Sequence, residues 1–536
     1  MRSRLLVCAA LLFGACSSDT RGHRNDGGGP GGNGDGGVPP GEDPTDCNAA
    51  AAAKSYVGCD YWPTVVGNNV WNIFDYAVVV ANAGVDTANI TVDGPNNVHQ
   101  TQMVPPNTLV KIYLPWVSDL KGVEADSCGS SVPLDGTISH PGGAYHLTSS
   151  IPVTVYQFNA LEYKGAGGAE FKDWSSCPGN QPCALNNNMP VGCFSFTNDA
   201  SLLLPSTAMT GNYRVTGFHG SGVPGLGGMT TYFAVTGTVA GTQVTVKLSS
   251  TATVLAGGGV PATGPGGTFT FTVGAGDVVE VVGQGDDATD LSGSLVKANN
   301  PVQVITGVPC TQNPTGVQAC DHMEESVFPA ETLGQHYFVT VPTGPRGKPV
   351  GHVVRLYGNF DGTHLTYDPP VAGAPATLNA GQVVDLGVLT TDFEVKGDQS
   401  FAVGSFMLGG EQVDPNAPQQ MQEGDPSQSM AVAVEQYRLK YVFLAPDDYD
   451  FSFVDVVAPS GTELMLDGVN VTVAAKPIGR SGFGVVRVPI PKSGEGAHVL
   501  TSTAPVGIQV MGYGLYTSYQ YPGGLDLNAI APVPIG

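Results

Sequence analysis

A divergent internal repeat constrains the fold of this chain more than any other feature of its sequence. A Gly-Thr turn followed by alternating apolar and polar residues occurs at 241–246, 362–367 and 461–466, each time after a strand-like run. A weaker first copy lies at 90–92. Alternation with a period of two residues behind a glycine turn is typical of a half-buried antiparallel strand. The repeat unit is therefore predicted to contain a β-hairpin.

Two further strand-like segments recur in the same order in each unit. The first has two adjacent apolar residues, a charged residue and another apolar residue, and its copies are 109–112, 278–281, 383–386 and 485–488. The second closes the unit, and its copies are 152–155, 301–304, 400–403 and 505–508. Most closing copies begin with proline, which loses no ladder hydrogen bond at the first residue of a strand. The repeats predict about four related β-modules.

The composition also favours an all-β fold. Charged residues make up only 13% of the 536 residues, whereas 74 glycines and 41 prolines supply turns. We expect tandem β-sandwich-like modules, with a propeller-like arrangement of repeated antiparallel sheets as the alternative. The expected modules, numbered one to four, are 47–198, 199–322, 323–428 and 429–536.

The N-terminus has the pattern of a bacterial lipoprotein signal. Basic residues precede an apolar stretch too short to span a bilayer, and residues 13–16 resemble a lipobox. We therefore expect a signal peptide at 1–15, lipid on Cys16, and a disordered glycine-rich tether at 16–46. This predicts a bacterial cell-surface, outer-membrane or periplasmic protein that contacts the membrane through its lipid only. Simple cleavage and secretion is the alternative.

The cysteines are typical of an exported protein with disulfide bonds. Of the ten cysteines, Cys8 lies in the signal and Cys16 is assigned to lipid, which leaves an even set. Cys310 and Cys320 flank a segment with proline and glycine, so we predict a bond between them. The sequence leaves open the partners of the others: Cys47, Cys59, Cys128, Cys177, Cys183 and Cys193. A metal site at the last three lacks the paired short spacing of zinc ligands.

Insertions separate each closing strand from the next module. They lie at 159–198, 309–322 and 409–428. Insertions at one place per repeat map to one face, which is often the binding face. The first insertion combines three cysteines with aromatic residues that we predict to bind a ligand: Phe171, Trp174, Phe194 and Phe196. The alternative is that these aromatic side chains fill a small satellite core under the loop.

The sequence offers little support for catalysis. It contains no zinc-protease helix motif, phosphate-binding loop or nucleophile elbow. The net charge of −24 argues against nucleic acid as a partner, because no stripe of basic residues is present to contact phosphates. Two loops gather aspartates, at 286–290 and 447–450. Asp286, Asp287 and Asp290 are a candidate Ca²⁺ site, with exposed solubilising turns as the alternative, and no other cofactor is expected.

Two motifs are similar to those of a known family: AYHLTSSIPVTVYQF at 144–158 and NDASLLLP at 198–205. In these motifs the chain resembles the N-terminal domain of the IgG-Fc-binding protein family, over about residues 55 to 520. The resemblance implies a non-enzymatic surface or extracellular protein associated with adhesion, with a protein or glycan as its ligand. It transfers no ligand-contacting residues. A hydrolase that acts on extracellular polysaccharide through loop carboxylates is the second hypothesis.

Replacement of Cys16 by serine tests the lipid anchor. We expect C16S to appear in the soluble fraction and the wild type in the membrane fraction, because the polar tether has no apolar surface with which to hold a bilayer. The measurement is cell fractionation followed by immunoblotting. Cys8→Ser, inside the signal, is the control and should fractionate as the wild type does. Membrane retention of C16S at the wild-type level contradicts lipid anchoring.

Overall fold

The computed structural model describes residues 43–223, 227–317, 320–492 and 496–535. The signal peptide, Cys16 and all but the last few residues of the tether lie outside the described residues. Within them the chain is an all-β protein of antiparallel sheets, as the composition and the repeats predict. The α-helices are short: α1 (Cys47–Ala53), α2 (Ser118–Lys121) and α3 (Gly410–Val413). No helix among the described residues is long and apolar enough to span a membrane.

The first group of strands forms one sheet in which a long strand, β7, pairs with several partners. Its members are β1 (Gly58–Tyr61), β2 (Tyr76–Asn82), β3 (Ala88–Gly94), β4 (Val98–Val104), β5 (Thr108–Leu114), β7 (His146–Asn159) and β8 (Asp199–Leu202). β7 pairs with β3 through its first half and with β2 through its second half. It therefore passes through two layers of strands, and its buried second half begins at the predicted closing segment.

The second group forms two sheets and a small hairpin. The first sheet contains β6 (Ile138–His140), β12 (Tyr232–Gly237), β15 (Val278–Val282), β17 (Val302–Thr311) and β18 (Asp321–Ser326). The second contains β9 (Asn212–Arg214), β13 (Thr242–Lys247), β14 (Thr268–Val273) and β16 (Leu295–Ala298). β13 alternates buried and exposed residues, as the hairpin motif predicts. The hairpin is β10 (Ser221–Val223) with β11 (Gly227–Met229).

The third group also forms two sheets. One contains β19 (His336–Val339), β21 (Thr363–Asp368), β22 (Thr377–Leu378) and β24 (Phe393–Gly397). The other contains β20 (His352–Gly358), β23 (Val383–Leu389), β25 (Phe401–Met407) and β26 (Gln428–Met430). Side chains from both sheets enter one apolar core, for example Val354 of β20 and Val395 of β24. The pair of sheets is therefore a sandwich.

The fourth group repeats the arrangement of the first, with a long strand shared between two layers. Its members are β27 (Arg438–Leu444), β28 (Phe451–Pro459), β29 (Leu464–Leu466), β30 (Val469–Asn470), β31 (Lys476–Pro477), β32 (Phe483–Pro489), β33 (Ala497–Gly514) and β34 (Thr517–Pro522). β33 pairs with β27 and β29 through its first part and with β28 and β34 through its second.

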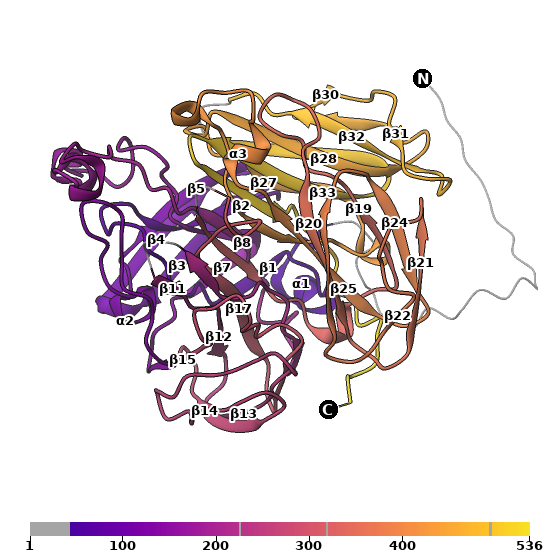
Figure 1. Ribbon diagram of the computed structural model, residues 1–536. Coiled ribbons are helices and arrows are strands. Elements are labelled where there is room, and N and C mark those ends of the chain that lie inside the picture. Colours follow the sequence, from indigo (N-terminus) through magenta and orange to yellow (C-terminus); the bar gives the residue numbers. More distant parts are fainter. Residues whose placement is uncertain (1–42, 224–226, 318–319, 493–495, 536) are drawn as a thin grey trace, which may run out of the picture. The chain divides into compact units, whose positions relative to one another are not determined.

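One strand order is common to all four groups. The rows are β5-β2-β7-β8, β15-β12-β17-β18, β23-β20-β25-β26 and β32-β28-β33-β34. The charged-pattern and closing segments occupy equivalent strands in every row, and the Gly-Thr hairpin segments occupy β3, β13, β21 and β29, outside the rows, because each copy has the same apolar pattern to bury. The boundaries assigned to the modules stay a prediction. The strands of the four groups follow one another in colour from indigo to yellow in Figure 1.

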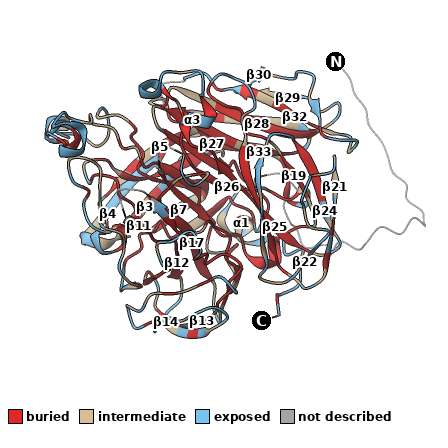
Figure 2. Ribbon diagram, viewed as in Figure 1, coloured by how far each residue is buried: buried red, intermediate tan, exposed pale blue. Residues whose placement is uncertain are grey.

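The last strands of the four rows meet in a closed ring. β8 packs beside β18, β18 beside β26, β26 beside β34, and β34 beside β8. Each repeat is thus sandwich-like, and the four repeats surround a common axis as the blades of a propeller do. Every residue of these four strands is buried, and the strands in the middle of the body are mostly red in Figure 2.

A buried carboxylate joins the strands of this ring. Asp199, the first residue of β8, accepts hydrogen bonds from the backbone N–H groups of Glu324 in β18 and Gln428 in β26, at 3.1 and 3.0 Å. Its other oxygen accepts from the Ser427 hydroxyl at 3.0 Å and from the backbone N–H of Gln520 in β34 at 3.4 Å. One side chain therefore satisfies donors from the three other groups of strands.

The two ends of the described body are held by the same residue. Arg438, at the start of β27, pairs with Asp43 at 2.8 Å and also with Asp526. Lys440 adds a second ion pair to Asp43 at 3.3 Å. Next to Asp526 in the sequence, the Leu527 N–H donates a hydrogen bond to the carbonyl of Lys54 at 2.7 Å. The start of the body is thus fixed to the last group of strands.

Asp199→Asn tests the role of the buried carboxylate. The amide keeps the volume but turns an N–H donor toward backbone donors, so we expect a loss on the order of 3 kcal/mol in unfolding free energy. The measurement is the midpoint of urea denaturation. Asp86→Asn is the matched control, since Asp86 is exposed, and its midpoint should equal that of the wild type. An unchanged midpoint in D199N contradicts the proposed role.

Candidate functional site

The three sequence insertions gather at one place, which we call the junction face and define as residues 159–198, 309–322 and 409–428. The turn between β33 and β34 contacts the first and the third insertion. The Leu515 N–H donates to the Tyr163 hydroxyl oxygen at 2.6 Å, and the Gly424 N–H donates to the Gly514 carbonyl at 2.8 Å. Insertions far apart in the sequence therefore lie together because each precedes a strand of the central ring.

The second insertion is tied to the third. The Gly409 N–H donates to the carbonyl of Asn313 at 2.8 Å, and the Asn313 side-chain amide donates to the carbonyl of Met407 at 2.7 Å. The Cys310–Cys320 disulfide closes this insertion, in the pairing expected from the sequence. The second insertion thus forms a short covalent loop beside the third.

Two disulfides brace the first insertion. Cys177 bonds to Cys193 within it, and Cys183 bonds to Cys128, which lies outside it. The remaining pair, Cys47–Cys59, ties α1 to β1. Because two disulfide bonds constrain the insertion, its backbone has little conformational freedom, and little conformational entropy would be lost on binding.

The four aromatic residues predicted to bind have different environments. Trp174 packs on Phe74 with ring centroids 5.1 Å apart and belongs to a small satellite core. Phe194 packs between Tyr163 and Phe196, at centroid distances of 5.7 and 5.3 Å. Phe171 contacts none of them and is exposed. Trp174 and Phe194 therefore pack under the loop, as the satellite-core alternative holds for them, whereas Phe171 is exposed to solvent. A binding role for these aromatic residues stays a prediction.

Further apolar side chains are exposed on the same face. The exposed fractions are 99% for Phe171, 78% for Leu185, 63% for Met189 and 63% for Met421. The first three lie on the disulfide-braced insertion, and the last lies on the third insertion. Large apolar side chains held in water on a constrained loop are typical of a contact surface.

A cleft of about 770 Å³ opens beside the third insertion. Its lining includes Arg346, Asp414, Met421, Glu423, Asp450 and Phe451. Arg346 makes a two-pronged ion pair with Asp414, through bonds of 3.1 and 2.6 Å. Asp450 pairs with Lys164 of the first insertion at 2.8 Å. The cleft therefore joins the second aspartate-rich loop to two of the insertions.

Glu423 is the unusual group in this cleft. Burial, together with the negative charge of Asp450, raises its pKa to about 7. One of its carboxylate oxygens is buried and has no hydrogen-bond partner among the described residues. A carboxyl group with a pKa near 7 can donate a hydrogen bond to a ligand when it is protonated and pair with a cationic group of a ligand when it is ionised.

The candidate Ca²⁺ residues at 286–290 do not converge on one point. Asp286 caps its own turn by accepting from the Thr289 N–H at 2.7 Å, and Asp287 accepts from the Gly222 N–H at 3.0 Å. Asp290 is buried and forms an ion pair with Arg355. No cluster of three or more His, Cys, Asp or Glu side chains with metal-binding geometry occurs in the described ranges. These aspartates stabilise their loop instead.

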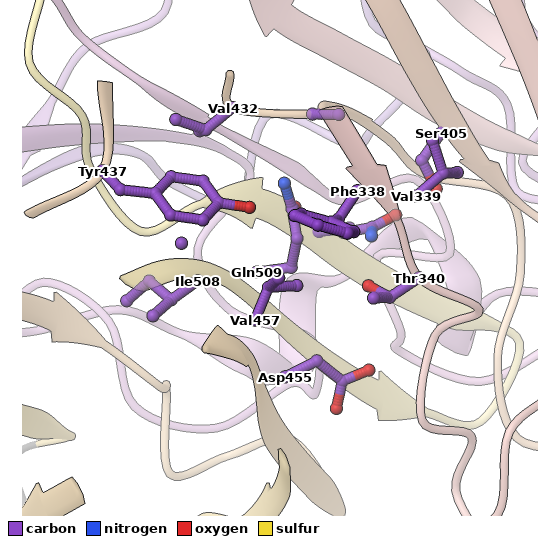
Figure 3. A pocket seen from close by; sticks show the side chains of 13 residues that line it. Phe338, Val339, Thr340, Ser405, Val432, Tyr437, Asp455, Val457, Ile508 and Gln509 are labelled. Carbon is purple, nitrogen blue, oxygen red and sulfur yellow. The ribbon is translucent and has the colours of Figure 1, made fainter. Parts of the chain in front are cut away.

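An interior cavity lies between β19 and the last group of strands (Figure 3). Its volume is about 30 Å³, and Tyr437, Asp455 and Gln509 are among its polar lining residues. A water molecule fits such a space, whereas an organic ligand does not. Burial raises the pKa of Asp455 to about 6, although Thr343 donates two hydrogen bonds to it. This cavity is part of the core packing.

The sequence indicated only part of this site. The sequence pointed to the insertions and to the aspartates at 447–450. It did not point to Arg346 or Glu423, because neither residue belongs to a recognisable motif and only the fold brings them to the cleft. The exposed Leu185, Met189 and Met421 were also missed. Isolated apolar residues in a loop become informative only when the disulfide pairing that fixes the loop is known.

Comparisons with known proteins give one clear family. The model of a family described as "IgGFc binding protein" matches residues 199–512. A human protein named IgGFc-binding protein is 34% identical over 120 residues, which cover 21% of this chain and 2% of that protein. The chain thus corresponds to a small fraction of its human relative.

Two solved structures align with this chain, both with very low TM-scores. An anti-sigma factor domain-containing protein from Clostridium clariflavum aligns at 11% identity over 60% of this chain and 83% of its own, with a TM-score of 0.12. A tetra-tandem repeat from the extending region of a large adhesion protein aligns at 12% identity over 88% of this chain and 99% of its own, with a TM-score of 0.09.

Removal of the Cys177–Cys193 bond should open the first insertion to protease. A disulfide that closes a loop of about 15 residues contributes roughly 3 kcal/mol, or about 100-fold in the population of the open loop. We expect the Cys177→Ala, Cys193→Ala variant to be cleaved after Leu185, inside the loop, by chymotrypsin about 100-fold faster than the wild type. Mass spectrometry of the fragments measures this rate. The control is Cys47→Ala, Cys59→Ala, which should leave cleavage at Leu185 unchanged; equal rates in all three proteins contradict the bracing role.

Proposed function

The chain belongs to the family of IgGFc-binding proteins, and on that premise we propose that it is an extracellular, non-enzymatic binding protein whose junction face recognises a protein or glycan. The name of the human relative states its ligand, immunoglobulin Fc, for that protein. For this chain the ligand class follows from the face itself: exposed apolar side chains next to an acidic cleft.

The observation that carries the proposal is the exposure of Phe171, Leu185 and Met189 on a loop crossed by two disulfides. Removal of exposed apolar side chains from water by a partner stabilises the complex by about 25 cal/mol per Å² of apolar surface buried. A braced loop loses little conformational entropy in the process. The strands of the repeats are committed to their own cores, so the insertions are the segments free to take a binding role.

We also propose that the protein is held at a bacterial membrane by lipid on Cys16 and acts there in adhesion. The glycine-rich composition of residues 17–46 predicts a random coil with a root-mean-square reach on the order of 30 Å. A reach of that size would separate the folded body from the lipid headgroups. A surface binding protein gains from this separation because its binding loops can then approach a partner on another surface.

A polysaccharide hydrolase is the second candidate, and the cleft is the observation that favours it. Glu423, whose pKa is raised, and Asp450 line the same cleft, and two carboxyl groups that face one cleft are the arrangement that glycosidases use. The two candidates differ in outcome. A hydrolase releases sugar from a bound polysaccharide and loses that activity in Glu423→Gln, whereas a binding protein leaves every bound glycan intact.

An array of glycans and extracellular proteins, including immunoglobulin Fc, should identify the ligand of the purified full chain. With that ligand, the triple variant Phe171→Ser, Leu185→Ser, Met189→Ser should bind at least about 10-fold more weakly, because truncation of central contact residues costs roughly 1–2 kcal/mol each. Surface plasmon resonance measures the dissociation constant.

Val469→Ser is the matched control, since Val469 is an exposed apolar residue outside the insertions. Its affinity should equal that of the wild type. A coarser variant replaces residues 165–192 by a short Gly/Ser bridge and also carries Cys128→Ala and Cys193→Ala, so that no unpaired thiol remains. Wild-type affinity in both the triple variant and the deletion removes the first insertion from the binding site.

A further inference from the structure

A lysine and two carboxyl groups meet where the first insertion leaves its sheet. Lys172 lies in this insertion, Asp75 immediately precedes β2, and Glu162 follows β7. Lys172 forms an ion pair with Asp75, and the Asp75 N–H donates to Oε2 of Glu162 at 2.8 Å. The side chains of Lys172 and Asp75 are only 11% and 16% exposed, and Glu162 is buried. All three polar side chains are therefore largely withdrawn from water.

The polar atoms of the three side chains converge on Gly168. A Cβ atom at this position would lie 2.6 Å from Oε1 of Glu162, 2.8 Å from Oδ2 of Asp75 and 3.2 Å from Nζ of Lys172. The φ of Gly168 is +82°, a conformation that also favours glycine. Because residue 168 has no side chain, the amine nitrogen and both carboxyl groups can approach one another.

Glu162 is suited to hold a proton beside this ion pair. Burial, followed by the neighbouring side chain of Asp75, raises the pKa of Glu162 well above its ordinary value. Its Oε1 is buried and has no hydrogen-bond partner among the described residues. The buried ion pair has in turn lost the hydration that favours its charged form in water. Transfer of the ammonium proton of Lys172 to the carboxylate of Asp75 gives a neutral amine and a carboxylic acid, which are the two partners of a condensation.

Neighbouring groups hold this pair in position. The Lys172 ammonium also donates to the carbonyl of Ile73 at 2.5 Å and lies 4.9 Å from the ring centroid of Trp174. The Ala169 N–H donates to Oδ2 of Asp75 at 3.3 Å. Such a donor stabilises the negative charge that develops on a carboxyl oxygen when a nucleophile adds to its carbon. A nucleophile and an electrophile held together in this way react with the advantage of an intramolecular reaction.

We propose that Lys172 and Asp75 condense to an amide that cross-links the first insertion to the segment leading into β2. The amine nitrogen of Lys172 adds to Cγ of Asp75, while Glu162 takes a proton from that nitrogen and gives a proton to the departing hydroxyl group. A C–N bond forms, a C–O bond breaks and one water molecule leaves. Glu162 ends in its starting state, and the reaction needs no oxidant, reductant or other co-reactant.

The amide braces the insertion independently of its disulfides. Reductants break the Cys177–Cys193 and Cys128–Cys183 bonds, whereas they leave an amide intact. The amide also acts at a different place, because Lys172 precedes every cysteine of the insertion. The side chains of the junction face thus keep one covalent support under reducing conditions.

Peptide mapping of the purified full chain by mass spectrometry tests the proposal. After reduction, alkylation and digestion with trypsin, residues 55–111 should be joined to residues 165–214, because trypsin does not cut after an acylated lysine. The mass of the joined species should be that of the two peptides less one water. Lys172→Arg keeps the positive charge but should give separate peptides. Glu162→Gln should form the amide at least about 100-fold more slowly, since general acid–base catalysis contributes on the order of 10²–10⁴-fold.

Gly168→Ala and Gly167→Ala form a matched pair of variants that leave every reacting group in place. Both glycines have positive φ, but a Cβ atom at 168 meets the three reacting side chains, whereas one at 167 meets nothing within 4 Å. We expect the amide to be lost in Gly168→Ala and kept in Gly167→Ala. Lys476, which pairs with Asp392 at 2.8 Å but is largely exposed, should stay unmodified in the same peptide map.

Three results contradict the proposal. Separate peptides 55–111 and 173–214 in the wild type overturn the amide itself. Formation of the amide in Glu162→Gln at the wild-type rate removes the proton transfer assigned to Glu162. Equal amounts of joined peptide in Gly168→Ala and Gly167→Ala contradict the assigned geometry.

Discussion

The carboxylate of Asp199 is the interaction on which the rest of the fold depends. Four rows of strands share no continuous sheet, so their edge strands must be joined by side chains. Asp199 satisfies backbone N–H groups of β18 and β26 that would otherwise be buried without partners. A polar axis of this kind fixes the register between rows, whereas apolar contacts alone would allow them to slide.

The ring in turn decides where variation is tolerated. Each insertion begins after a closing strand and ends at a strand of the ring, so its ends are fixed while its middle is free. Three unrelated insertions are thereby brought to one end of the axis without any need for matching sequences. Two disulfides then stiffen the first insertion.

The sequence predicted the strands well and the site only in part. The recurring apolar segments, such as 278–281 and 485–488, fall in equivalent strands β15 and β32, because burial imposes the same local pattern on every copy. The environments of Trp174 and Phe171 were not predictable, since the two differ only in whether Phe74, far away in the sequence, lies under them. The contacts of Asp199 with the backbone of Glu324 and Gln428 have no local signal either, because ring formation alone brings these strands together.

The attachment of Asp43 to Arg438 and Lys440 has a mechanical consequence. In the anchored protein proposed above, a pull on a bound partner would place tension on the body at Asp43. The ion pairs of Asp43 would share that tension between the last group of strands and the first group, into which the chain continues. The first group would then not bear the load alone, and resistance to stretching would depend on these ion pairs as well as on the closed ring.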